Sequence, residues 1–184
     1  MSKGPSLVPP RARSGRGTDR PSRAVEGLSH VDAGGRARMV DISDKPDSDR
    51  RATAEGALFC ATETLTLVRE GKTPKGAVIS TAELAGVMGA KRTAELIPLC
   101  HPLPLSKIAV SIVEDARLPG FRVSAEAKTR GSTGVEMEAL TGAAVGLLTV
   151  YDMVKAVDRG MTLEAVRLEE KSGGRSGVFR RSRS

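Results

Sequence analysis

The sequence is poor in aromatic residues. It contains no tryptophan, one tyrosine and three phenylalanines among 184 residues. A core built from this chain must therefore be aliphatic, and few rings are available on which nucleic-acid bases could stack. The apolar fraction of 39% is sufficient for one domain with a modest core.

Cysteine and histidine are also scarce. Cys60 and Cys100 are isolated, and His30 lies far from His101 in the sequence. Without a Cys-x-x-Cys pair or an H-E-x-x-H pattern, a disulfide scaffold and a zinc site are both disfavoured, and we expect no metal ligands. This cysteine usage fits a reducing cytoplasm.

Long hydrophobic runs are absent. No apolar run reaches the ~18 residues that a membrane-spanning helix needs, so we expect no membrane partner. The basic N-terminus has no hydrophobic block after it, which is unlike a secretory signal.

The formal net charge of +7 comes from the two ends of the chain. Residues 1–27 carry +4 and residues 178–184 carry +3, so residues 28–177 are neutral overall. We predict a disordered, basic extension over residues 1–27, which are rich in Pro, Gly, Ser and Arg. The domain then spans residues 28–179, and a basic tail covers 180–184. Basic tails can contact anionic partners, but we expect no nucleic-acid partner.

Hydrophobic periodicity predicts the following elements. Alternation predicts a strand over 39–43 and a hairpin with strands around 108–112 and 121–127. Helical spacing predicts a helix from about 49 to 70, and Gly71 is suited to its C-terminal cap. A capping box at Ser80 and Glu83 predicts a helix to about 92. A long helix over 136–158 and a strand at 166–168 complete the chain. This order favours an α+β fold, an antiparallel sheet with helices on one face, of the ferredoxin-like type.

Polar residues on the long helix are the first candidate site. Asp152 and Lys155 are three residues apart and can form an ion pair, which on an exposed helix would contribute little. Glu138 precedes Asp152 by 14 residues, or about 21 Å of helix. Glu138 and Asp152 therefore cannot both contact one reacting atom. If both matter, either the substrate is long or the two residues serve different subunits.

Three loops carry further candidates. Cys100 and His101 lie between prolines in the stretch 96–102, where His101 could transfer protons or form a structural hydrogen bond. The stretch 171–177 combines glycines, hydroxyls and cations, and could be an anion-binding nest or a flexible basic end. Lys75 lies in a turn and on pattern alone would simply be solvated.

Taken together, these motifs resemble the MoaC family, whose members are cyclic pyranopterin monophosphate synthases. The matching segments are 28–32, 39–43, 90–93, 96–102, 133–140, 151–157 and 171–177. The resemblance implies conversion of (8S)-3',8-cyclo-7,8-dihydroguanosine 5'-triphosphate to cyclic pyranopterin monophosphate with release of diphosphate, in molybdenum cofactor biosynthesis. It implies a phosphorus-oxygen lyase that needs no cofactor and assembles as a homohexamer, a trimer of dimers.

The resemblance also implies roles for particular residues. The family's catalytic residues fall on Asp152, Lys75 and Lys155. Its substrate-binding residues fall on Leu99, Cys100, His101, Met137, Glu138, Lys171 and Arg50. Two other hypotheses stay open at this point: a phosphate-binding module without catalysis, and an inactive relative that keeps only the fold.

Overall fold

The computed structural model describes residues 36, 38–115 and 118–182. The predicted extension over residues 1–27 and the matching segment 28–32 lie outside the described residues. The elements are β1 (Ser48–Phe59), α1 (Thr62–Arg69), α2 (Val78–Lys91), α3 (Thr93–Leu96), β2 (Leu105–Asp115), β3 (Gly120–Gly131), α4 (Glu136–Val154), β4 (Thr162–Ser172) and β5 (Phe179–Arg180).

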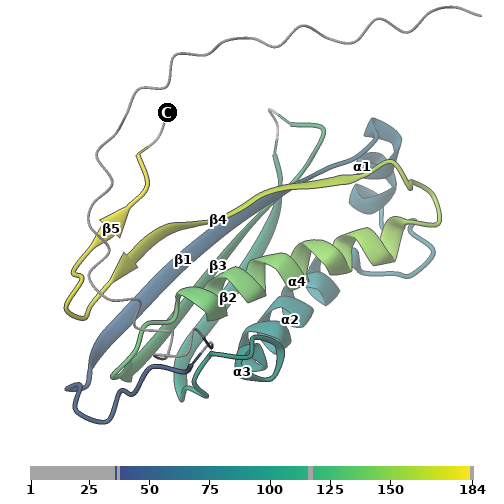
Figure 1. Ribbon diagram of the computed structural model, residues 1–184. Helices are drawn as coiled ribbons and strands as arrows, with labels where there is room; N and C mark the ends of the chain where they lie inside the picture. Colours follow the sequence, from purple (N-terminus) through teal and green to yellow (C-terminus); the bar gives the residue numbers. More distant parts are fainter. Residues whose placement is uncertain (1–35, 37, 116–117, 183–184) are drawn as a thin grey trace, which may run out of the picture.

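The five strands form one antiparallel sheet in the order β2-β3-β1-β4-β5 (Figure 1). Because β1 and β2 are both antiparallel to β3, they run parallel to one another with β3 inserted between them. In the same way β1 is inserted between β3 and β4. Two interleaved βαβ units of this kind are the ferredoxin-like arrangement, so the predicted α+β fold is confirmed.

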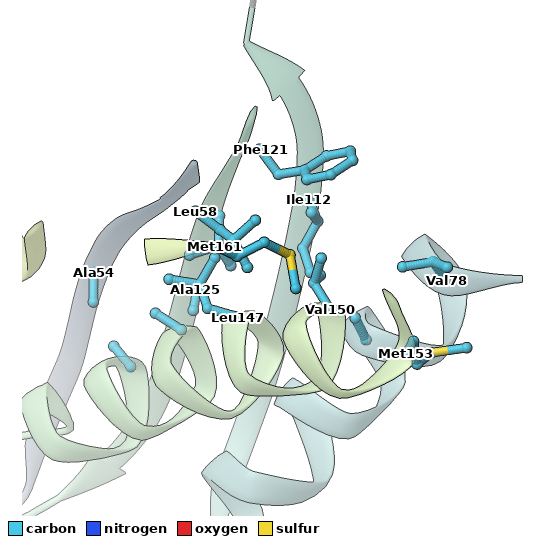
Figure 2. Packing of buried hydrophobic residues seen from close by; sticks show 14 of the residues in the cluster. Ala54, Leu58, Val78, Ile112, Phe121, Ala125, Leu147, Val150, Met153 and Met161 are labelled. Atoms are coloured by element: carbon cyan, nitrogen blue, oxygen red, sulfur yellow. The ribbon is translucent and has the colours of Figure 1, made fainter. Parts of the chain in front are cut away.

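Helices α2 and α4 cover one face of the sheet (Figure 1). Leu58, Phe121 and Ile112, from three different strands, form one buried cluster with Leu147 and Val150 of α4 (Figure 2). All five side chains are less than 5% exposed. As the composition predicts, this core is mainly aliphatic. By length and composition α4 could cross a membrane, but 56% of that window is buried inside the fold, which is typical of a core helix.

Small residues bring α4 close to α2. The segment 139–146 contains three alanines and two glycines, residue types that permit close approach of another backbone. A Cβ on Gly86 of α2 would lie 2.8 Å from the Gly142 carbonyl oxygen of α4. The two backbones therefore approach closely at Gly86, where a Cβ would collide with the carbonyl oxygen of α4.

The predicted helix starting near residue 49 is wrong, because 48–59 is the central strand β1. Its alanines suit a helix, but β1 is paired on both sides, by β3 and β4. Ala52, Ala54 and Leu58 are fully buried under the helices, whereas Arg51 points away from them. Period-two alternation of small apolar and polar residues over 51–55 is the feature of the sequence that indicates this strand. Only the last part of the predicted helix exists, as α1.

The predicted strand over 39–43 is also wrong. Residues 39–42 have no regular secondary structure, and a turn begins at Ser43. The Ser43 backbone N–H and hydroxyl both donate to the Asp41 carboxylate, at 2.9 and 2.7 Å. This local Asx-type hydrogen bonding competes with strand pairing.

Helix boundaries differ from the predictions in two places. Helix α2 begins at Val78, and its N-cap Ala77 makes no side-chain cap, so the predicted capping box at Ser80 is wrong. Glu83 instead accepts a hydrogen bond from the Ile112 backbone N–H of edge strand β2, at 2.9 Å. Helix α4 ends at Val154, four residues before the predicted end at Asp158.

The hairpin, the α1 cap and the last strand agree with the sequence patterns. Gly71 has φ of +66°, and the hydrogen bonds from its N–H and that of Lys72 form a Schellman-type end to α1. The last strand, β4, extends well beyond 166–168. Arg180, which we assigned to the basic tail, pairs with β4 as part of β5.

A matched pair of glycine substitutions tests the helix contact. Gly86→Ala should lower the free energy of unfolding by about 1–3 kcal/mol, because the new methyl group collides with a backbone carbonyl. Gly146→Ala is the control: its Cβ would lie no closer than 3.5 Å to its neighbours, so its helix propensity should raise stability by up to ~1 kcal/mol. Urea denaturation at equal protein concentration measures both, and equal effects would contradict the packing argument.

Candidate active site

The predicted catalytic residues come together at the C-terminal end of α4. The Asp152 carboxylate contacts Lys75 Nζ at 2.6 Å through one oxygen and Lys155 Nζ at 2.8 Å through the other. Lys75 comes from the loop between α1 and α2, so the fold brings together two segments 77 residues apart. The sequence predicted the Asp152–Lys155 pair from its spacing and Lys75 as a partner from another segment or subunit. The structure shows that Lys75 comes from another segment of the same chain.

Two ammonium groups stabilise the ionised form of this carboxylate. Hydrogen bonds from Lys155 and then Lys75 lower the pKa of Asp152 to about 2. The same bond to Asp152 raises the pKa of Lys155 above its ordinary value. Each of the three side chains is about half exposed, between 46% and 53%. At neutral pH the cluster is one carboxylate between two protonated amines, open to a ligand.

A second group of predicted residues surrounds a cavity at the other end of α4. The cavity has a volume of about 500 Å³. Leu99, Cys100 and His101 contribute one wall from the Pro-rich loop, and Met137 and Glu138 contribute another from the first turn of α4. These five residues, predicted to bind substrate, therefore share one cavity in the structure.

The carboxyl group of Glu138 is buried, which is unusual for a group that can carry a charge. Glu138 is only 4% exposed. Burial raises its pKa above the usual range for a carboxyl group, and nearby Glu136 adds to that rise. The pKa of the Cys100 thiol is also raised, by burial and by the charge of Glu138. A carboxyl group that is less readily ionised can exchange protons nearer to neutral pH than a solvated one.

An adjoining cavity of about 540 Å³ contains Arg50 and Lys171. The two cavities share four lining residues, Lys45, Thr133, Gly134 and Glu136. Lys45, Arg50, Lys171 and Arg175 give the second cavity a cationic wall suited to an anionic ligand. Sequence reasoning missed Lys45, because the wrongly predicted strand over 39–43 hid the turn that carries it.

Glycines 173 and 174 fix the form of this cationic wall. Both have positive φ, and a Cβ on Gly174 would lie 1.6 Å from the Arg50 guanidinium. Arg50 in turn donates to the carbonyl oxygens of Gly131 and Ser132, at 3.1 and 3.3 Å. Residues 173–178, which connect β4 to β5, therefore pack on Arg50.

The two groups of residues do not meet within one chain. Glu138 and Asp152 lie at opposite ends of α4, about 21 Å apart along its axis. Neither cavity is lined by Lys75, Asp152 or Lys155. Within the part of the chain that the structure describes, no group of three or more His, Cys, Asp or Glu side chains could hold a metal ion.

Comparison with known proteins gives a consistent result. A sequence model of the MoaC family matches residues 39–174. The chain is 61% identical over 152 residues to a cyclic pyranopterin monophosphate synthase of Methylobacterium sp. strain 4-46, covering 83% of this chain and 95% of that protein. The chain belongs to the MoaC family.

Other relatives of this MoaC-family chain carry the same name. The protein from Dinoroseobacter shibae is 57% identical over 155 residues, or 84% of this chain and 98% of that protein. The protein from Cereibacter sphaeroides strain KD131 is 56% identical over 158 residues, or 86% and 99% of the two chains. Every predicted site residue lies inside the range that the MoaC model matches.

The charge of Asp152 can be tested by titration. Because the pKa of Asp152 is about 2, its carboxyl ¹³C signal should change little between pH 7 and pH 3. The stabilisation that this carboxylate provides is present above its unfolded pKa and is lost as the pH falls toward the folded value. Removing both lysines, in Lys75→Ala/Lys155→Ala, should bring the midpoint back toward an ordinary aspartate value. A signal that already titrates near that value in the unmodified protein would contradict the ion-pair geometry.

Proposed function

We propose that this chain is a cyclic pyranopterin monophosphate synthase. It converts (8S)-3',8-cyclo-7,8-dihydroguanosine 5'-triphosphate to cyclic pyranopterin monophosphate and diphosphate in molybdenum cofactor biosynthesis. The observation that carries the proposal is membership of the MoaC family, with relatives of that name matched over nearly their whole length. The paired lysines around Asp152 and the cationic cavity supply side chains that such a reaction needs.

Asp152, Lys75 and Lys155 are the proposed catalytic residues. The low pKa of Asp152 makes it a weak base, so its main role is to position the two ammonium groups. Those amines can donate protons while the heterocycle and the ribose-derived part are rearranged. They can also stabilise negative charge that develops when a substrate hydroxyl attacks the α-phosphorus and diphosphate leaves.

The two adjoining cavities are the proposed substrate-binding surface. Arg50 and Lys171 bind phosphate oxygens in the cationic cavity. Lys45 lines both cavities and adds a third cation for the phosphates. Leu99, Cys100, His101, Met137 and Glu138 bind the heterocycle in the neighbouring cavity. The raised pKa of Glu138 suits a carboxyl group that hydrogen-bonds to a neutral ring.

A complete site requires a second copy of the chain. The proposed catalytic residues and the proposed binding cavities lie at opposite ends of α4, so catalytic residues of one subunit would act on substrate held by another. We propose a homohexamer, a trimer of dimers. Leu84 and Met88 of α2 and Leu148 of α4 are each at least 49% exposed, which is consistent with helix surfaces that an assembly covers.

A cytoplasmic location follows from the same proposal. Cys60 and Cys100 are both free, as expected of a chain kept in a reducing compartment.

Turnover of the enzymatically prepared cyclic triphosphate is the direct test. The unmodified protein should release diphosphate and yield a product that oxidises to a fluorescent pterin. Asp152→Asn should lower kcat by about 100-fold or more, because the neutral amide no longer holds the two ammonium groups. A folded, oligomeric protein that gives no product would favour a phosphate-binding module without catalysis.

Subunit mixing tests whether sites are shared between chains. Lys75→Ala and His101→Ala should each be inactive, since each removes one half of every site. After mixing in equal amounts with exchange of subunits, about a quarter of the sites should contain both native halves. Recovery of activity toward that level supports a shared site, whereas complete inactivity of exchanged oligomers contradicts it.

A further inference from the structure

The Lys75–Asp152 contact cannot fix its own geometry. Both side chains are about half exposed, and exposed ion pairs contribute little because water screens them and long side chains lose entropy on pairing. The contact also joins a loop to a helix end that are distant in sequence. Other interactions must therefore hold the two segments in register.

Asp158 joins those two segments. It follows α4 by four residues, and its Oδ2 accepts hydrogen bonds from the Ala61 backbone N–H at 2.9 Å and the Thr64 hydroxyl at 3.1 Å. Its Oδ1 accepts from the Gly160 backbone N–H at 2.9 Å. The Asp158 N–H donates to the Val154 carbonyl at 3.1 Å, which connects this carboxylate to the end of α4.

The carboxylate also completes the start of α1. Ala61 is the N-cap of this helix and has no capping side chain of its own. Asp158 accepts hydrogen bonds there from another part of the chain, where a negative charge is favourable. The bond from Ala61 is the main cause of the lowered pKa of Asp158. Thr64, which donates the second bond, is only 3% exposed, so water does not readily replace the carboxylate.

A short and well-connected path leads from Asp158 to Lys75. Helix α1 has eight residues and ends in the Schellman-type bonds at Gly71. The Thr73 hydroxyl then donates to the Gly76 carbonyl at 2.6 Å, and the Gly76 N–H donates to the Thr73 carbonyl at 3.2 Å. These two bonds close the turn that carries Lys75. Figure 1 shows α1 beside the turn that follows α4.

We propose that Asp158 is a positioning residue for the site, which holds α1 and the Lys75 turn against the end of α4 so that Lys75 Nζ meets the Asp152 carboxylate. This inference rests on the proposed function for its effect on turnover, but its effect on geometry is independent of that function. Lys155 lies on the same chain segment as Asp152, so its contact with Asp152 does not depend on Asp158.

The experiment uses a zero-length carbodiimide cross-link on the full-length oligomer. The reagent joins a carboxylate to an amine in direct contact, and peptide mass spectrometry separates the Lys75–Asp152 product from the Lys155–Asp152 product. Asp158→Asn keeps the side-chain shape but replaces one of the two acceptor oxygens with an NH₂ group, which cannot accept these hydrogen bonds. The ratio of the two products should fall several-fold, with Lys155–Asp152 as the internal reference.

Turnover of the same variant provides the second measurement. Asp158→Asn should lower kcat by about 10- to 100-fold, because misplacement of a catalytic group by about 1 Å has effects of that size. KM should stay within about twofold, because the proposed binding cavities at the other end of α4 are unchanged. Glu63→Gln is the charge control: it removes a carboxylate from the first turn of α1 and should change neither measurement.

A second variant keeps the test decisive if Asp158→Asn does not fold. Thr64→Val removes one of the three hydrogen bonds that the Asp158 carboxylate accepts. It should lower the cross-link ratio and kcat, as Asp158→Asn does. Thr64→Ser, which keeps the hydroxyl, should leave both near the values of the unmodified protein. Thr66→Val is the matched control, because its hydroxyl donates only to Thr62 of the same helix. An unchanged cross-link ratio in folded Asp158→Asn or Thr64→Val would overturn the proposal. A reduced ratio in these variants, together with no turnover in the unmodified protein, would uphold positioning and refute the proposed function.

Discussion

Close backbone contact between α4 and α2 is the constraint on which the rest of the structure depends. Glycine at position 86 leaves room for the Gly142 carbonyl, so the two helices meet without intervening side chains. On its other side α4 presses Leu147 and Val150 into the sheet. A helix packed on both sides in this way is a rigid support, and Glu138 and Asp152 near its two ends lie about 21 Å apart along its axis.

The two ends of that helix offer different electrostatic environments. At the C-terminal end, Asp152 is half exposed and its charge is maintained by two lysines. At the N-terminal end, Glu138 is buried and its ionised form is disfavoured. A reaction with several proton transfers and a triphosphate substrate needs both fixed cations and a group that exchanges protons nearer to neutral pH. The fixed cations and the buried carboxyl group lie at opposite ends of α4. Under the proposed function, a single subunit is therefore insufficient.

Polar contacts between distant segments complete the site where the core does not reach. The residues of the loop with Lys75 and of the turn after α4 are mostly exposed. One carboxylate at Asp158 and one hydroxyl at Thr73 supply the hydrogen bonds that order these segments. Arg50 orders the binding cavities in a similar way, because its hydrogen bonds join the start of β1 to the end of β3 and to the loop that follows. Local order at the site therefore depends on a few side chains that contact backbone atoms.

Sequence alone determined the α+β fold, the hairpin, the long helix and the family, because these depend on periodicity and on motifs read along one stretch of chain. It also determined the Asp152–Lys155 pair, since the helical repeat places residues three apart in contact. The sequence is ambiguous over 48–59, since its alanines suit a helix and only residues 51–55 alternate as in a strand. The tertiary structure decided for a strand, because pairing on both sides outweighs the helix propensity of the alanines. Only the tertiary structure placed Lys75 on Asp152 and joined Lys45, Arg50 and Lys171 around one cavity. Such contacts link segments far apart in the chain, and no local pattern encodes the distance between them.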